Sequence, residues 1–195
     1  MRSLHPEWYN APVPSFGPAS ARLLIVGLAP GLSGANRTGR PFTGDHAGVL
    51  LYSTLLEFGF ATGKYEARPD DTLVMGDAVL SNAVRCVPPA NKPESSEVKT
   101  CRQFLIRTMD ALPNRRAIVA LGRIAHESVV RALGEPLARF PFAHGGEHIV
   151  ARTDGRLALF DSYHCSRYNT STGVLTTDMF RAVFARVRAY LDTSA

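Results

Sequence analysis

Apolar positions along the chain form short runs that alternate with longer stretches of helical periodicity. Compact apolar runs at residues 22–26, 77–83 and 117–121 predict buried strands, because glycine or short polar residues bound them. Two further apolar segments, 148–151 and 157–161, are expected to pair across a turn at Thr153-Asp154-Gly155. The chain therefore carries the strands of a central sheet.

Helical periodicity follows most of these strands. Apolar residues at i, i+3 and i+4 predict a helix that begins near His46 and ends before Gly59, and others over residues 95–112, 123–133 and 176–191. In the first of these helices, the inward face is expected to carry Val49, Leu50, Leu55, Leu56 and Phe58. Strands that alternate with helices predict a parallel sheet with helices on both faces.

A single domain is expected to span residues 1–195. Residues 1–20 contain four prolines and no periodic apolar pattern, so we expect them to form an arm on the surface. No apolar stretch is long enough to cross a bilayer or to act as a secretory signal. We therefore expect a cytoplasmic protein without membrane contact, and a monomer as its simplest state.

The charge of the chain suits an anionic partner. Lysine and arginine outnumber aspartate and glutamate by 22 to 17, which gives a net charge of +5 and a pI near 9.4. Such an excess attracts the phosphates of nucleic acid, although it is also common on ordinary protein surfaces. The three cysteines, Cys86, Cys101 and Cys165, form no CxxC motif, so in a cytoplasmic chain we expect them to be reduced.

Polar loops at residues 27–45 and 162–173 each follow a predicted strand, and Asn82 lies at the end of another. In a parallel sheet the carboxyl ends of the strands meet at one edge, where ligands bind. The residues expected to share a pocket there are Phe42, Asp45, Asn82 and His164. An aromatic face, a carboxylate, an amide and an imidazole together suit the recognition of a planar heterocycle.

Four motifs occur in these segments: GLAPG at 27–31, NRTGRPFTGD at 36–45, SNAVRCVPPANKP at 81–93 and SYHCSRYNT at 162–170. Together they resemble the uracil-DNA glycosylase superfamily, and most closely its family five, or B-type, branch. The glycine motif alone would be weak, but four ordered motifs at three strand ends are specific. The resemblance implies a three-layer α/β sandwich with a central, mainly parallel four-stranded sheet flanked by helices.

The resemblance also implies an activity on uracil-containing DNA. An enzyme of this kind flips the deaminated base out of the duplex and hydrolyses its N-glycosidic bond, which leaves an abasic site. The base would stack on Phe42 and lie against Gly27 and Ala29, and Asn82 would pair with the N3–H and O4 groups of uracil. His164 would donate a hydrogen bond to O2 as negative charge accumulates on the leaving base.

Two segments would face the duplex if the resemblance holds. Ser166, Arg167 and Asn169 would belong to the loop that holds the flipped base outside the helix. Arg37 and Arg40 lie in the other loop, where they are either phosphate contacts or ordinary surface charge.

The first loop departs from the pattern of the best-known branch at two positions. Ala29 replaces an aspartate that activates water, and a methyl group cannot do so. Asp45 is the candidate for this catalytic role, although an aspartate at this place also serves as a helix cap. Gly31 replaces a tyrosine that excludes thymine, which predicts a range of substrates broader than uracil, with hypoxanthine and xanthine as examples.

The resembled branch binds a four-iron cluster through four cysteines. Cys86 and Cys101 match two of the ligands, but the N-terminal pair is missing and Cys165 lies beside the expected active site. Because a cubane cluster needs four ligands, we expect no cofactor and no metal ligands; the alternative is a [4Fe-4S] cluster with Cys86 and Cys101 among its ligands. The remaining histidines in the body of the chain are expected to be surface or packing residues: His46, His126, His144 and His148.

Two other functions remain open on the sequence. A DNA-binding protein that recognises damaged bases without cleaving them would keep Phe42 and Asn82 and would need neither Asp45 nor His164. A nucleotide- or phosphate-binding enzyme that uses the glycine loop is the weaker alternative, because the P-loop lysine and the GxGxxG pattern are both absent.

Overall fold

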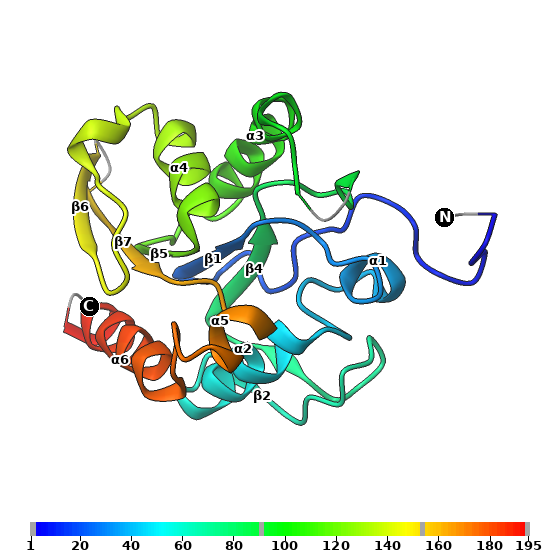
Figure 1. The fold of residues 1–195 in the computed structure, drawn as a ribbon. Helices are drawn as coiled ribbons and strands as arrows, with labels where there is room; N and C mark the ends of the chain where they lie inside the picture. The colour runs from blue at the N-terminus through cyan, green and yellow to red at the C-terminus, as the bar shows by residue number, and fades with distance from the viewer. Residues whose placement is uncertain (1–2, 90–91, 153–154, 194–195) are drawn as a thin grey trace.

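The computed structural model describes residues 3–89, 92–152 and 155–193, which form one sheet with helices on both faces (Figure 1). The strand order is β4-β1-β5-β7-β6. The strands β1 (Leu23–Gly27), β4 (Ala78–Asn82), β5 (Ala117–Leu121) and β7 (Gly155–Ser162) run parallel, and β6 (Glu147–Arg152) is antiparallel to β7. The predicted α/β fold with a mainly parallel sheet is confirmed.

The sheet has five strands where four were expected, because β6 pairs with β7 along its whole length. The register runs from Glu147 opposite Phe160 to Arg152 opposite Gly155, so the hairpin adds an edge strand to the sheet. The predicted pairing of residues 148–151 with 157–161 is confirmed. Thr153 and Asp154 of the predicted turn lie outside the described residues.

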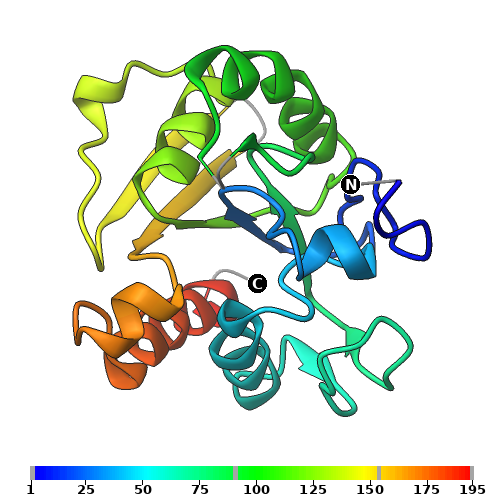
Figure 2. The same ribbon diagram turned by 45° about the vertical axis from the view of Figure 1, so that its right-hand side comes forward.

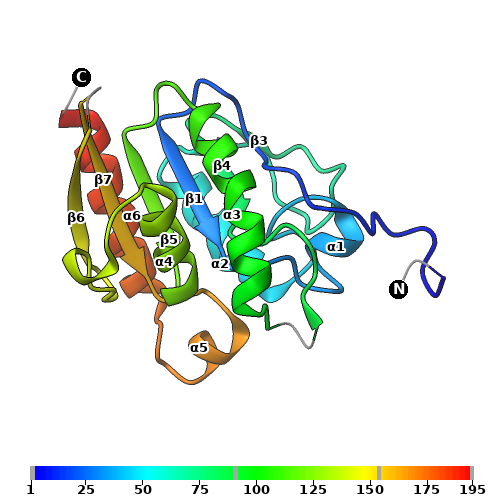
Figure 3. The same ribbon diagram turned by 90° about the horizontal axis from the view of Figure 1, so that it is seen from above.

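Helices cover both faces of the sheet (Figures 1 and 3). On one face lie α3 (Ser95–Asp110) and α4 (Arg123–Ala132), and on the other lie α2 (His46–Glu57) and α6 (Thr177–Thr193). Within the described ranges, no helix combines the length and apolarity that crossing a membrane requires.

Several short elements escape prediction because they are too brief to carry a periodic pattern. They are α1 (Ala35–Thr38), α5 (Arg167–Ser171), a 3-10 helix at Leu137–Arg139, and the strands β2 (Ala61–Thr62) and β3 (Val74–Met75), which pair antiparallel.

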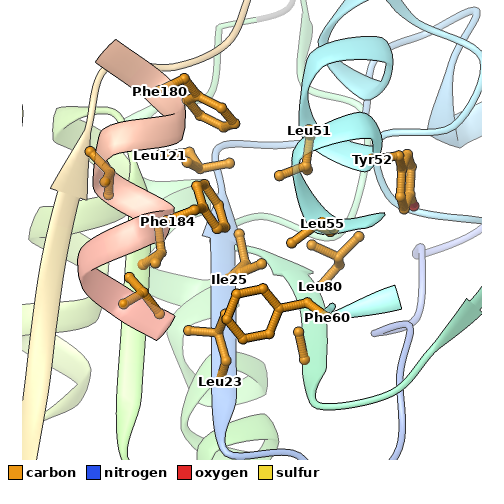
Figure 4. Close-up of a cluster of buried hydrophobic side chains, with 14 of the residues drawn as sticks. Leu23, Ile25, Leu51, Tyr52, Leu55, Phe60, Leu80, Leu121, Phe180 and Phe184 are labelled. Atoms are coloured by element: carbon orange, nitrogen blue, oxygen red, sulfur yellow. The ribbon is translucent and has the colours of Figure 1, made fainter. Parts of the chain in front are cut away.

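The core lies in two layers, one on each face of the sheet. Leu23 and Ile25 of β1 pack toward α2 and α6, whereas Leu24 and Val26 pack toward α3 and α4. Figure 4 shows the first layer, in which Phe184 of α6 and the side chains of α2 meet Ile25. Because both faces are covered, β1 is apolar along its length until it ends at Gly27.

The inward face of α2 matches the predicted one in part. Leu55 is buried as expected, and Leu50, Leu56 and Phe58 pack partly buried against the core. Val49, expected to be buried, is 58% exposed, and the helix also buries Leu51 and Tyr52, which the predicted face did not include. The loop before the helix helps to hold Tyr52 inside, since Tyr52 donates its hydroxyl hydrogen to the Pro41 carbonyl oxygen at 2.6 Å. Periodicity located this helix and most of its inward face.

The N-terminal segment is only partly a surface arm. Val13 is buried, and its N–H donates to the carbonyl oxygen of Arg85 at 2.8 Å. Phe16 forms a bridge with Leu80 of β4 through hydrogen bonds of 2.8 and 2.9 Å. This part of the predicted arm therefore completes the edge of the sheet beside β4.

Candidate functional site

The loops that follow β1, β4 and β7 surround a pocket of about 670 Å³ at the carboxyl edge of the sheet. In Figure 2, the short helices α1 (blue) and α5 (orange) lie on opposite sides of this edge. The pocket is lined by residues 28–35, Phe42, residues 45–47, Asn82, His164, Ser166 and Arg167. The fold thus brings together the four residues that the sequence suggested would meet.

Phe42 forms an aromatic wall of the pocket beside Gly27. A Cβ atom on Gly27 would overlap the Phe42 ring and lie 2.5 Å from Oδ1 of Asn82, so only glycine allows the ring and the amide to approach here. Phe42 is 5% exposed and also joins the core, and its φ of 56° is rare for a bulky residue. The surrounding structure therefore holds the ring in place against local backbone strain.

Asn82 ends β4 in register with Gly27 and is 6% exposed. Within the described residues, its side-chain amide has no hydrogen-bond partner. Buried amides normally have such partners. The donor and the acceptor of Asn82 are therefore free for a ligand in the pocket.

The imidazole of His164 faces the Phe42 ring, with centroids 6.2 Å apart and planes inclined by 28°. It makes no hydrogen bond within the described part of the chain. Burial lowers the pKa of His164 from 6.5 to about 4. At neutral pH the ring is thus uncharged, with one N–H donor and one acceptor nitrogen.

Asp45 has two surroundings, one for each carboxylate oxygen. Its Oδ1 accepts a hydrogen bond from the Gly48 N–H at 3.2 Å and caps α2. Its Oδ2 lies against the glycine loop, where a Cβ atom on Gly34 would come within 2.6 Å of it. Burial raises the pKa of Asp45. The residue is therefore both a helix cap and a carboxylate in the wall of the pocket.

The loop that carries His164 is fixed by its own neighbours. The Asn169 side chain donates to the His164 carbonyl oxygen at 2.8 Å, and Ser166 accepts from the Asn169 N–H at 3.4 Å as the cap of α5. Cys165 is fully buried and donates to the Ala47 carbonyl oxygen at 3.5 Å, and burial raises its pKa to about 12. Asn169 thus supports the loop from within, and its contact with DNA stays a prediction.

Arg40 does not lie on the surface, so its expected contact with DNA is wrong. Its guanidinium donates to both carboxylate oxygens of Asp71 at 2.7 and 2.8 Å and to the Thr43 hydroxyl at 2.7 Å. It also lies 5.2 Å from the ring centroid of Phe16. Since Arg40 is 6% exposed and its donors are engaged, it is a structural residue beneath the loop.

Arg37 and Arg167 are the exposed arginines at the rim of the pocket. The Arg37 Nε donates to the Ser33 carbonyl oxygen at 2.8 Å, which directs the side chain along α1. Arg167 begins α5 and lines the pocket itself. Among the described residues, neither arginine has a carboxylate partner. Both remain available to an anion.

Two rim residues were missed on the sequence. His46 lines the pocket, and its Nε2 lies 3.0 Å from the Thr170 hydroxyl, which joins the start of α2 to α5. Tyr168 of α5 is 72% exposed. The available signals were the position of His46 directly after Asp45 and that of Tyr168 inside the SYHCSRYNT motif.

The cysteines do not fit the ligand set of a four-iron cluster. Burial and the Cys101 thiol raise the pKa of Cys86, and both cysteines lie at least partly at the surface. Cys165 is instead buried in the loop beside the pocket. In the described structure at most two thiolates could reach one cluster, which is half of the usual set.

Comparisons with known proteins agree with this geometry. The family described as "Uracil DNA glycosylase superfamily" matches residues 14–188. A type-5 uracil-DNA glycosylase of Thermus thermophilus is 44% identical over 183 residues, which cover 94% of this chain and 81% of the relative. A type-5 uracil-DNA glycosylase of Pyrobaculum aerophilum is 37% identical over 94% of this chain and 78% of its own length. A type-4 enzyme of the same organism is 36% identical over 67% of this chain and 59% of its own length.

Proposed function

The chain belongs to the uracil-DNA glycosylase superfamily, and we propose that it excises uracil from DNA in the pocket at the carboxyl edge of the sheet. The observation that carries the proposal is the free amide of Asn82 and the neutral, unpaired imidazole of His164 beside the ring of Phe42. A pocket of about 670 Å³ is large enough for a flipped nucleotide.

Asn82 reads the edge of the base in this proposal. Its amide oxygen accepts from N3–H of uracil, and its amide nitrogen donates to O4. Cytosine presents the reverse pattern at these two positions, so a fixed amide rejects it. The close contact of Asn82 with Gly27 supports this role, because it limits the orientations that the amide can adopt.

His164 stabilises the leaving base. As the N-glycosidic bond breaks, negative charge accumulates on uracil O2, and the neutral imidazole donates its N–H to that oxygen. A donor that is already in position needs no reorganisation during the reaction. The hydrogen bond from Asn169 to the His164 backbone supports such a fixed position.

Asp45 orients the attacking water or stabilises the positive charge on the sugar. Ala29, which also lines the pocket, offers no group for either task. The variant Asp45→Asn separates the two roles of this residue, because asparagine caps a helix as well as aspartate does but carries no charge. We expect Asp45→Asn to keep its unfolding midpoint and to lose most of its single-turnover cleavage rate. Cleavage at the wild-type rate would refute the catalytic assignment.

Gly31 carries no side chain in the wall of the pocket, where a Cβ atom would lie 3.3 Å from Oδ2 of Asp45, and we infer that bases other than uracil enter beside it. Hypoxanthine and xanthine are the first candidates. The variant Gly31→Tyr should narrow the range, and because it also crowds Asp45 its rate on each base is compared with its own rate on uracil. A panel of oligonucleotides with uracil, hypoxanthine, xanthine or mismatched thymine tests the inference, and wild-type cleavage of uracil alone would contradict it.

The DNA substrate is held through Arg37 and Arg167, whose exposed guanidinium groups suit phosphate contacts. One pocket on one domain suffices for the reaction, so we propose a monomer. We also propose that this 195-residue chain works without an iron–sulfur cluster, because its cysteines supply only half of a ligand set. A purified protein free of iron would agree with this; stoichiometric iron and sulfide would refute it.

The function is tested by abasic-site formation in a uracil-containing oligonucleotide under single-turnover conditions. We expect His164→Ala to lower the rate constant by about 10²–10³. Asn82→Ala should lower it as well, with weaker discrimination against cytosine. His5→Ala, which removes a histidine that stacks on Trp8 in the N-terminal segment, is the matched control and should cleave at the wild-type rate.

A further inference from the structure

Three ligand-type side chains meet in the interior beneath the loop of His164. His126 comes from α4, His148 from β6 and Asp161 from β7. One nitrogen of each histidine and one carboxylate oxygen all lie within 4.8 Å of one another. None of the three lines the pocket, and the proposed base excision uses none of them.

The hydrogen bonds of His126 call for a proton or a cation between this ring and Asp161. His126 Nε2 lies 2.7 Å from the Phe140 carbonyl oxygen, which only accepts, so this nitrogen carries a proton. His126 Nδ1 then faces Oδ1 of Asp161 at 2.7 Å, where a neutral ring would present a lone pair to an anion. A proton between the two atoms, carried by the ring or by the carboxyl group, resolves this, and so does a metal ion. A ring N–H bound to a backbone carbonyl is also the usual support of a metal-ligating histidine.

The other two ligand atoms lack hydrogen bonds within the described residues. Oδ2 of Asp161 and Nε2 of His148 are buried and have no hydrogen bond, although they lie 3.5 Å apart. Asp161 has no exposed surface, and a buried carboxylate oxygen without a partner is costly. Gly146 approaches both atoms closely: a Cβ atom there would lie 3.3 Å from Oδ2 and 3.6 Å from Nε2, and 3.0 Å from the Ala143 carbonyl oxygen, so a larger residue would crowd the cluster.

We propose that His126, His148 and Asp161 bind a divalent transition-metal ion of the Zn²⁺ type. Nitrogen and oxygen ligands about 2.0–2.2 Å from a tetrahedral ion are roughly 3.3–3.6 Å from each other, and the 3.5 Å between His148 and Asp161 already matches. The contact of 2.7 Å between His126 and Asp161 opens by less than an ångström when the ion replaces the proton. Three protein ligands leave a fourth position for water.

The ion would have a structural role. It ties α4, β6 and β7 together, and one of its ligands, Asp161, precedes His164 by three residues. None of the cysteines is among its ligands. Because it binds the folded chain, it raises the free energy of unfolding. The proposed metal site differs from the prediction made on the sequence, which treated His126 and His148 as surface or packing residues and expected no metal ligand.

The probe is Zn²⁺ alone, added to chain that has been freed of metal with a chelator. We expect isothermal titration to show one ion per chain. At free Zn²⁺ about a hundredfold above its Kd, the unfolding midpoint should rise by about 5–11 °C. Co²⁺ in place of Zn²⁺ should give visible bands of a four-coordinate ion, without a thiolate charge-transfer band.

Variants assign the ion to these residues. His148→Gln changes the most accessible ligand, and we expect it to fold without metal and to lose both the binding and the rise in midpoint. His5→Gln and Cys86→Ser are matched controls that should keep both. The proposal is overturned if the wild type binds no Zn²⁺, if His148→Gln binds it as tightly, or if Cys86→Ser abolishes binding. In the first two cases the three side chains would share a proton in place of a metal ion. In the last case the cysteine thiols would bind the ion.

Discussion

Replacing His164 by glutamine tests how burial sets the charge of the pocket. The pKa of His164 is about 4 in the folded chain, against 6.5 for an ordinary histidine. Between these values the unfolded chain binds a proton that the folded chain does not. The free energy of unfolding therefore rises with pH across this window, and His164 costs stability as pH falls below 6.5.

The size of the effect follows from the two pKa values. At about 1.4 kcal/mol per pKa unit, a shift of this size corresponds to roughly 3 kcal/mol when the pH is below both values. Between pH 8 and pH 4.5, about 2–3 kcal/mol should be lost. Glutamine has no charge to gain, so His164→Gln should escape this loss.

The assay is urea denaturation of the wild type and of His164→Gln at several pH values from 4.5 to 8. Groups that both proteins share, such as Asp45, cancel in the difference between the two curves. We expect the two free energies of unfolding to converge at low pH or to cross. Parallel curves over the whole range would show that His164 titrates normally, which would also remove the argument for a neutral hydrogen-bond donor in catalysis.

Three further substitutions separate structural from binding roles. Arg40→Met removes the cation beside Asp71, whose side chain has no exposed surface and keeps only two backbone N–H donors, so we expect a loss of about 3 kcal/mol in urea denaturation; an unchanged midpoint would contradict the structural role. Arg167→Ala should keep that midpoint and lower the slope of log affinity against log salt by about 1 in DNA-binding titrations, and an unchanged slope would exclude a phosphate contact. Gly27→Ala forces the Phe42 ring aside, so it should destabilise the chain by about 1–3 kcal/mol and slow cleavage. Wild-type stability together with a wild-type rate would show that the packing between Gly27 and Phe42 tolerates an extra methyl group.

The order of the main elements could be predicted because their patterns are local. The apolar run before Gly27 predicts a buried strand, and in the structure this strand lies inside the sheet between β4 and β5. The convergence of Phe42, Asn82 and His164 followed from one general property of parallel sheets, that their carboxyl ends share an edge.

Features that depend on distant partners could not be predicted. Arg40 stands in a polar loop like a surface residue, and only the fold reveals that Asp71, thirty-one positions later, meets it in the interior. The burial of Val13 similarly depends on Arg85. The cluster of His126, His148 and Asp161 joins three elements whose spacing in the sequence has no motif.

The pocket joins parts of the chain with very different local stability. Its floor is formed by Asn82 and by Leu28, which follows Gly27, at the ends of the neighbouring strands β4 and β1, whose residues are buried throughout. Its rim is built from α1 and α5, which have four and five residues and are too short to persist without their neighbours. Amide hydrogens should therefore exchange slowly at the floor and quickly at the rim. If the proposed roles of these residues hold, this division would let selectivity and turnover change separately: we expect substitutions at the floor to alter which base is accepted, and substitutions at the rim to alter how fast DNA is engaged and released.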